Sequence, residues 1–209
     1  MYRKTLVAGT VLALFAGVSL AQSFDVVVVG SGGAGLSAAI MAKEAGSSVV
    51  VLEKMPYIGG NSNFASGGMN AACTKQQIAG GVTNDSPEIF YQDTMKGGHN
   101  LNNPALLKTL TENARYAEEW LVDLGAKFCF RKGRGGGQSI ARGHGPCDGS
   151  AVGPEVLRVL TARLKADKVE ILKNHQVVDI LMKDGAVAGV KVKTPKGTET
   201  IDAKAVVLA

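Results

Sequence analysis

Runs of apolar residues separated by turn-forming residues set the pattern of elements in the first part of this chain. Residues 24–30 are apolar and β-prone apart from one aspartate, which predicts a strand buried on both faces of a sheet. Residues 33–45 have the composition of a helix, and residues 48–52 predict a second buried strand that ends at Glu53. A strand, a helix and a strand within roughly 30 residues predict a βαβ unit with parallel strands.

The middle of the chain is predicted to alternate between loops and helices. Residues 59–72 are rich in Gly, Asn and Ser, which indicates a functional loop or a series of turns. Residues 131–153 contain many glycines and several basic residues, and they predict a second, longer loop. Proline suits the first turn of a helix, so we expect helices to begin near Pro87, Pro104 and Pro154.

From residue 169 onward the pattern changes to strands. Asp184-Gly185 and Lys196-Gly197 are hairpin turn signals, so this part of the chain predicts a β-meander. The sequence stops in an apolar run that has the character of a buried strand, and we expect the domain to be incomplete at its C-terminus. The strands are expected at residues 169–172, 176–182, 186–193, 198–202 and 205–209.

The first 21 residues differ from the rest. Arg3 and Lys4 precede an apolar run, and Ser19-Leu20-Ala21 has the small residues of a cleavage site, so residues 1–21 have the form of a secretory signal peptide. The alternative is an uncleaved membrane anchor, but the run is short against the roughly 20 apolar residues that span a bilayer. We therefore expect a periplasmic protein that begins at Gln22 and has no stable membrane span after cleavage.

Charge and cysteine content exclude several classes of protein. The formal net charge is +5, of which Arg3 and Lys4 contribute two, and no aromatic and basic stripe accompanies it, so we expect no nucleic-acid partner. The three cysteines, Cys73, Cys129 and Cys147, lie far apart and show no haem-attachment or zinc spacing, so no metal site is expected. The odd number leaves at least one unpaired thiol, and we expect three ordinary free or buried cysteines.

The glycines between the first predicted strand and helix have the spacing of a dinucleotide-binding turn. Gly30, Gly32 and Gly35 form G-x-G-x-x-G, in which the glycines allow a tight turn, a close approach to a pyrophosphate and packing of the helix on the strand. Glu53, at the end of the second strand, is placed to accept hydrogen bonds from a ribose. A glycine-rich turn that binds nothing does not account for Glu53, but the motif alone does not separate NAD from FAD.

The segment after Glu53 resembles a known family. The run "EKMPYIGGNSNFASGGMNAA" (53–72) is similar to the flavin-binding loop of the fumarate reductase and succinate dehydrogenase flavoproteins. The resemblance continues through "DSPEIFYQDTMKGGHNLNNPALLKTL" (85–110) and "RGHGPCDGSAVG" (142–153), and is strongest to the soluble, periplasmic flavocytochrome c type. It implies an α/β fold, an FAD/NAD(P)-binding Rossmann-like domain in which residues 22–209 form the N-terminal part.

The resemblance also implies how the cofactor, FAD, is held. The glycine turn would contact the pyrophosphate, Glu53 the ribose and the backbone of Val177 the adenine, although Val177 could equally be a packed strand residue. Membrane-bound relatives tether the flavin through a histidine in this loop, and residues 59–72 contain none, so the FAD is expected to be noncovalent. The implied cofactor residues are Gly30, Gly32, Gly33, Ala34, Gly35, Glu53, Lys54, Asn61, Ser62, Ser66, Gly67, Gly68 and Val177.

The expected substrate contacts depart from the family pattern. Soluble members carry R-x-H-R-P-x-G-G, whereas this chain has Gly145 in place of the second arginine and Asp148 in place of a glycine, which puts fumarate itself in doubt. Gly67 is expected to touch a substrate. Arg142 and His144 could bind an anionic substrate, and His144 could equally cap a turn.

The reaction implied is hydride transfer from reduced flavin to the double bond of an unsaturated carboxylate such as fumarate. A separate electron donor, such as a cytochrome, is expected, and the catalytic residues are expected beyond Ala209. Three alternatives stay open: a urocanate or other enoate reductase of the same family, a nicotinamide-dependent dehydrogenase, and a flavin-domain fragment with no activity of its own.

Overall fold

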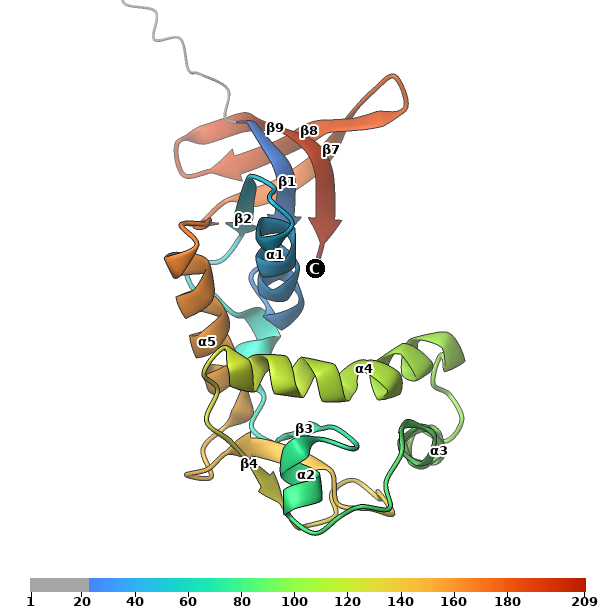
Figure 1. Ribbon diagram of the computed structural model, residues 1–209. Coiled ribbons are helices and arrows are strands. Elements are labelled where there is room, and N and C mark those ends of the chain that lie inside the picture. Colours follow the sequence, from blue (N-terminus) through green and yellow to red (C-terminus); the bar gives the residue numbers. More distant parts are fainter. Residues whose placement is uncertain (1–22) are drawn as a thin grey trace, which may run out of the picture.

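The computed structural model describes residues 23–209, and the expected signal peptide lies outside the described residues. Its main feature is a six-stranded sheet with the order β6-β2-β1-β9-β8-β7 (Figure 1). Strands β6, β2, β1 and β9 run parallel, and β7, β8 and β9 form an antiparallel meander. The expected α/β fold with a parallel sheet and a meander is confirmed. The strands are β1 (Ser23–Val29), β2 (Val49–Glu53), β6 (Glu170–Lys173), β7 (Gln176–Lys183), β8 (Ala186–Thr194) and β9 (Gly197–Leu208).

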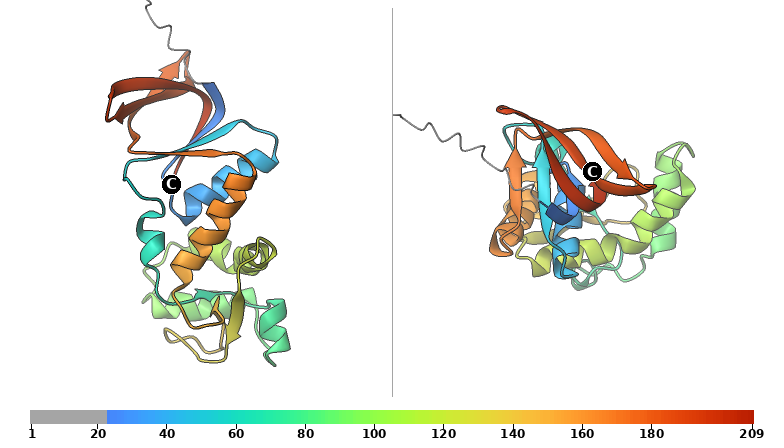
Figure 2. Two further views of the ribbon diagram at one scale, coloured as in Figure 1. Left: turned by 90° about the vertical axis from the view of Figure 1, so that its left-hand side faces the viewer. Right: turned by 90° about the horizontal axis from the view of Figure 1, so that it is seen from above.

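Two helices cover one face of this sheet, and the meander curls over the other (Figure 2). Because successive side chains of a strand point to opposite faces, neighbouring valines of β1 enter different cores. Val28 packs with residues of α1 (Gly33–Glu44) and α5 (Val152–Ala166), while Val27 packs with apolar residues of β8 and β9. Packing on both faces explains why residues 26–29 of β1 and 49–52 of β2 are all valine or leucine.

The long last strand corrects one expectation. We predicted separate strands at 198–202 and 205–209, but β9 runs without a break from Gly197 to Leu208. Its first half pairs antiparallel with β8, its second half pairs parallel with β1, and Asp202 pairs with both neighbours. The strand changes partner at Asp202, and the alternation of buried and exposed residues continues through Ala203 and Lys204, so the strand does not end there.

A smaller sheet and four helical segments form the other end of the molecule, at the bottom of Figure 1. Its strand order is β3-β5-β4, all antiparallel, and α4 crosses between it and the main sheet. The strands are β3 (Met69–Asn70), β4 (Phe128–Arg131) and β5 (Gly143–Pro146). The helices are η1 (Gly60–Phe64, a 3-10 helix), α2 (Lys75–Ala79), α3 (Pro87–Gly97) and α4 (Pro104–Asp123).

Capping side chains set the starts of the helices in this part. Ser86 accepts a hydrogen bond from the amide of Ile89 at the start of α3, and Asn103 accepts from two amides at the start of α4. Each helix then has proline in its first turn, as the sequence predicts. Within residues 23–209, no helix is both long and apolar enough to cross a membrane.

The glycine-rich stretch 131–153 is not one continuous loop as predicted. Residues 143–146 form β5, the central strand of the small sheet, which pairs with β4 and with β3. The strand was missed because its sequence, Gly-His-Gly-Pro, has low β propensity. Its two neighbours supply the hydrogen-bonding partners that make it a strand.

The cysteine expectation is also wrong in part. Cys129 and Cys147 form a disulfide with their Cα atoms 4.9 Å apart, and Cys73 is free. The two cysteines are 18 residues apart in sequence, but the antiparallel pairing of β4 and β5 places them side by side. Sequence spacing alone does not show that pairing.

Candidate functional site

The turn from β1 into α1 brings the three motif glycines together. Gly30 has a φ of 107°, a conformation that favours glycine, and a Cβ at Gly35 would clash with the carbonyl oxygen of Gly30. The third glycine therefore lets the helix pack against the end of the strand. The N-terminus of α1 has no side-chain cap, and its first turn has no acidic residue. Such a helix end, with free N–H groups and the positive end of the dipole, fits a phosphate group.

Glu53 lies beside this turn, and its carboxylate is held by the protein. One oxygen accepts hydrogen bonds from both the amide and the hydroxyl of Ser31, and the other accepts from the amide of Met55 at 2.8 Å. Burial alone would raise the pKa of Glu53, but these hydrogen bonds outweigh it and hold the pKa below its ordinary value. Glu53 is therefore ionised at neutral pH and fixed in place at the carboxyl end of β2.

Ser31 connects Glu53 to the flavin-loop candidates, and sequence reasoning did not single it out. It is fully buried, and its hydroxyl donates to Glu53 while accepting from the amide of Gly59 at 3.1 Å. Ser62, three residues further along, accepts from the amide of Gly33 at 3.0 Å. The glycine turn, the end of β2 and the start of η1 therefore form one connected unit.

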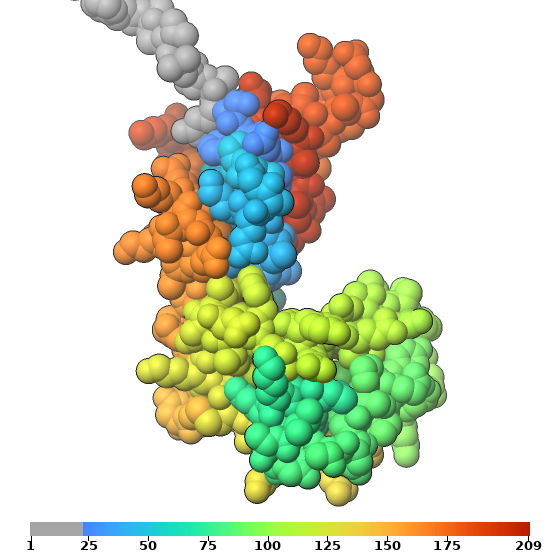
Figure 3. Space-filling view, viewed as in Figure 1, coloured from blue at the N-terminus to red at the C-terminus, as the bar shows by residue number. Residues whose placement is uncertain are grey.

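The other expected cofactor residues lie around this unit. His175 and Asn174 donate backbone hydrogen bonds to the carbonyls of Glu53 and Met55, which brings the start of β7, and with it Val177, next to the end of β2. Ser62 is half-buried, and the remaining expected residues are exposed: Lys54, Asn61, Ser66, Gly67 and Gly68. The face of the molecule is hollowed between the end of β9 and α4 (Figure 3).

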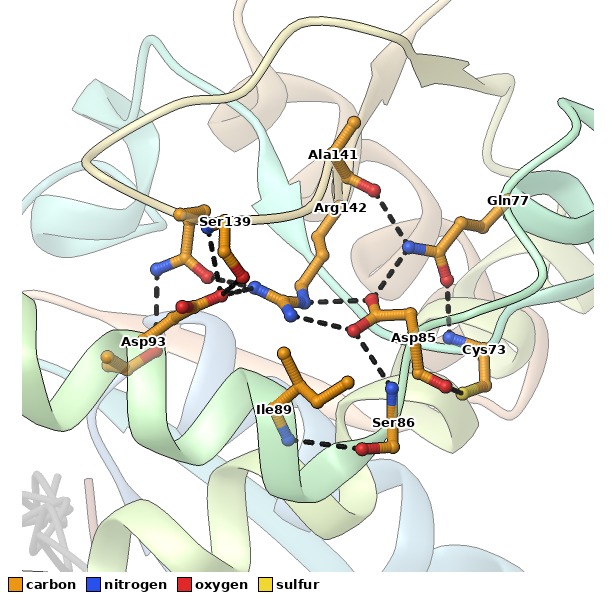
Figure 4. A network of polar contacts seen from close by, with 11 residues as sticks. Cys73, Gln77, Asp85, Ser86, Ile89, Asp93, Ser139, Ala141 and Arg142 are labelled. Carbon is orange, nitrogen blue, oxygen red and sulfur yellow. Dashed lines mark hydrogen bonds and ion pairs between the residues drawn. The ribbon is translucent and has the colours of Figure 1, made fainter.

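Arg142 belongs to a different cluster, a network of polar contacts with residues of α3 and of the segment before it (Figure 4). It is only 1% exposed, and its guanidinium makes a two-point ion pair with Asp85, at 2.7 and 2.8 Å. A second ion pair joins it to Asp93 at 2.6 Å, and Gln138 accepts a further hydrogen bond. These contacts tie the glycine-rich loop to α3 and to the segment before it.

His144 is equally enclosed. Its Nδ1 faces the carbonyl oxygen of Arg142 at 2.8 Å and its Nε2 faces the hydroxyl of Thr74 at 2.7 Å. A carbonyl only accepts, so Nδ1 carries the proton, and a neutral ring then accepts at Nε2 from Thr74. Burial lowers the pKa of His144, which favours this neutral form. Thr74 in turn caps α2, so His144 contacts the side chain that caps this helix, and neither of the two roles expected for His144 is decided by these contacts.

The structure therefore divides the expected site residues into two groups. It brings together the glycine turn, Glu53, Ser62 and the start of the Val177 strand, and it places Arg142 and His144 together in a buried network of the lower part of the molecule. Contact of Arg142 or His144 with a substrate stays a prediction. Arg142 lies 57 residues from Asp85 and 49 residues from Asp93 in sequence, so no local signal predicts these ion pairs.

Residues 25–209 match the family described as FAD binding domain, and the chain belongs to that family. Three curated relatives are similar over 90 or 91% of the chain. They are NADH:fumarate oxidoreductase of Klebsiella pneumoniae (strain 342), 48% identical, fumarate reductase (cytochrome) of Shewanella frigidimarina, 46%, and urocanate reductase of Eggerthella lenta, 37%. The chain spans 20, 33 and 32% of their respective lengths.

A solved structure described as the open conformation of a flavocytochrome c3 fumarate reductase has the same fold. The TM-score is 0.84 at 39% identity, over 90% of this chain and 33% of that one. The expected resemblance to the flavoprotein family is confirmed, and FAD is the cofactor that this family indicates.

Proposed function

We propose that this chain is the N-terminal part of the flavin domain of a larger reductase, which reduces the double bond of an unsaturated carboxylate such as fumarate. One observation carries this proposal: the chain that forms the connected unit is 46–48% identical, over 90% of its length, to relatives named for fumarate reduction, and it has the fold of a fumarate reductase. Since the chain spans a third or less of those relatives, the activity belongs to the complete protein.

In this proposal the residues of the unit divide the work of holding FAD. The N-terminus of α1, with Gly32, Gly33 and Ala34, binds the pyrophosphate, because the positive end of the helix dipole and the amides that have no partner favour an anion, while the amide of Gly33 donates to Ser62. Glu53 accepts from the ribose, and the backbone of Val177 contacts the adenine. Asn61, Ser62, Ser66 and Gly67 line the flavin, which supplies the hydride when it is bound and reduced.

The FAD is proposed to be noncovalent, because residues 59–72 offer no histidine for a tether. Glu53 and Ser62 contribute polar contacts only, which acid unfolding abolishes. Acid precipitation of the complete protein should leave the flavin in the supernatant, and flavin that stays in the pellet would refute this part of the proposal.

Export to the periplasm is proposed from the form of residues 1–21. The disulfide between Cys129 and Cys147 supports it, because disulfides persist in oxidising compartments and are rare in the cytosol. An exported reductase of this kind takes its electrons from a separate redox partner. No residue of 23–209 is proposed as the proton donor.

The substrate is tested by steady-state turnover of the complete protein with a reduced viologen as electron donor. We expect reduction of fumarate, and a slower or absent reaction with urocanate, since the relatives with higher identity are fumarate reductases. Turnover of urocanate alone would move the assignment to the enoate alternative. Absence of turnover with both, in a protein loaded with FAD, would contradict reduction of either acid.

A further inference from the structure

One arginine that the proposed function does not use lies on the outer face of the small sheet. The pairing of β4 with β5 sets Cys129 opposite Gly145 and Arg131 opposite Gly143. Because side chains alternate along a strand, Arg131 shares one face with the two glycines, and the half-buried Phe130 and the buried His144 occupy the other face. Arg131 is half-buried, so its side chain is accessible on this outer face.

The guanidinium of Arg131 fills the space above Gly145. A Cβ at Gly145 would lie 2.6 Å from Nη2 and 2.8 Å from Cζ of Arg131, so no larger residue fits there while Arg131 keeps this position. On its other side the same guanidinium reaches Gly68, where a Cβ would lie 3.7 Å from Nη1. Arg131 therefore lies between the middle of β5 and the glycine pair of the expected flavin loop.

The hydrogen-bonding capacity of Arg131 is mostly unused. Among residues 23–209 no carboxylate lies within 4.0 Å of it, and its one hydrogen bond is a long contact of 3.5 Å with the carbonyl of Ser150. Arg142, by contrast, has two carboxylates and an amide around its guanidinium. A guanidinium has five N–H donors in a fork that matches a carboxylate, so Arg131 is equipped to bind an anion.

This placement accounts for the departure from the family pattern noted at residue 145. The family pattern on which the resemblance rests has an arginine there, whereas this chain has glycine, and the guanidinium of Arg131 from the neighbouring strand lies over Gly145. We propose that Arg131 supplies the positive charge at this place and binds a carboxylate group of the substrate beside Gly67 and Gly68. The inference rests on the proposed function, because it takes the substrate to be a carboxylate.

The test measures binding of malonate, an unreactive dicarboxylate, to the oxidised complete protein through the change in flavin absorbance. Arg131→Ala should raise the dissociation constant about 10-fold or more, as expected for loss of a charge-assisted hydrogen bond. Arg134→Ala, which removes an exposed arginine of the following loop, should change it less than about twofold. FAD content and the unfolding midpoint of Arg131→Ala should match those of the unchanged protein.

A second variant separates charge from packing. The double variant Arg131→Gly/Gly145→Arg moves the arginine from β4 to β5. Its dissociation constant for malonate should be within about threefold of that of the unchanged protein. Binding that is unaffected by Arg131→Ala, or not restored by the double variant, would overturn the inference.

The same measurements distinguish this inference from the proposed function. Normal fumarate turnover, together with a dissociation constant for malonate that Arg131→Ala does not change, would refute the inference alone. Malonate binding that depends on Arg131 in a protein that reduces no unsaturated carboxylate would refute the proposed function alone. No binding of malonate to the unchanged protein would overturn the inference, and turnover alone would then decide the proposed function.

Discussion

At the scale of single residues, Glu53 has two roles, of which the sequence predicts only one. Its place after β2 predicts a ribose contact, but its carboxylate also holds Ser31 and Met55, and through Ser31 the amide of Gly59. The loop that starts at Gly59 therefore depends on the same side chain that is proposed to bind FAD. Removing that side chain tests both tasks together.

Glu53→Ala in the complete protein should weaken FAD binding by about 1.5–3 kcal/mol, the range for charge-assisted hydrogen bonds. FAD affinity is measured by titrating the apoprotein and following flavin fluorescence. The matched control is Ser31→Ala, which keeps the carboxylate and removes only the hydroxyl that organises it. An equal loss in both variants would mean that Glu53 acts by holding the loop and makes no direct contact with the ribose.

Glu118 is a buried carboxyl group on α4 for which the proposed function has no use. It is 1% exposed, and its Oε1 has no hydrogen-bond partner among the described residues. Burial, with a smaller contribution from the neighbouring Glu119, raises the pKa of Glu118 to about 7. The folded protein therefore keeps a proton that the unfolded chain loses above about pH 4.5, and stability falls as the pH rises from about 4.5 to 7.

Glu118→Leu should stabilise the protein more at pH 8 than at pH 4. The difference in the free energy of unfolding should be about 2–3 kcal/mol, because the leucine removes the cost of ionising a buried carboxyl group. Urea unfolding at the two pH values measures this difference. The control is Glu112→Leu, which replaces an exposed carboxyl group of the same helix. A gain that does not change with pH would show that Glu118 is not protonated in the folded protein.

At the scale of elements, the sequence predicts correctly the helices and strands for which amino-acid composition and hydrophobic period indicate the same type of element. The valine runs of β1 and β2, the proline starts of α3 and α4 and the turn before β8 all lie where they were expected. The strand β5 was missed because its pairing partners, β3 and β4, lie elsewhere in the chain. The break expected inside β9 was wrong because the strand changes partner at Asp202 without stopping.

The Arg142 network is the element-scale feature whose removal should cost most. Arg142 joins the glycine-rich loop to α3 by buried ion pairs, and its carbonyl accepts from the amide of Ala71 and from His144. Arg142→Ala should lower the free energy of unfolding by about 3–5 kcal/mol, because it leaves two carboxylates without their partner in the protein interior.

The matched control is Arg163→Ala, which breaks two ion pairs at a partly exposed position on α5. It should cost no more than about 1 kcal/mol. Urea unfolding of both variants gives the comparison. Similar costs for the two substitutions would show that the buried network contributes no more than surface ion pairs.

At the scale of the whole molecule, two bodies meet where the expected cofactor residues lie. The main sheet supplies the glycine turn, Glu53 and the start of β7, while the small sheet supports Gly67 and Gly68 through the pairing of β3 with β5. The first group could be predicted from sequence because a local motif specifies it. The environment of the second group, including Arg131 above Gly145, could not be predicted from sequence, because it depends on contacts between strands that are distant in the chain.

The central claim is that this chain forms part of a flavin site that serves reduction of an unsaturated carboxylate. It is tested most directly by a single turnover of the purified complete protein. The bound flavin is reduced without oxygen and then mixed with fumarate, and its absorbance is followed. The account predicts that the oxidised flavin spectrum returns in proportion to the enzyme present. Flavin that stays reduced in the presence of excess fumarate and of urocanate, or a purified protein that contains no flavin, would contradict it.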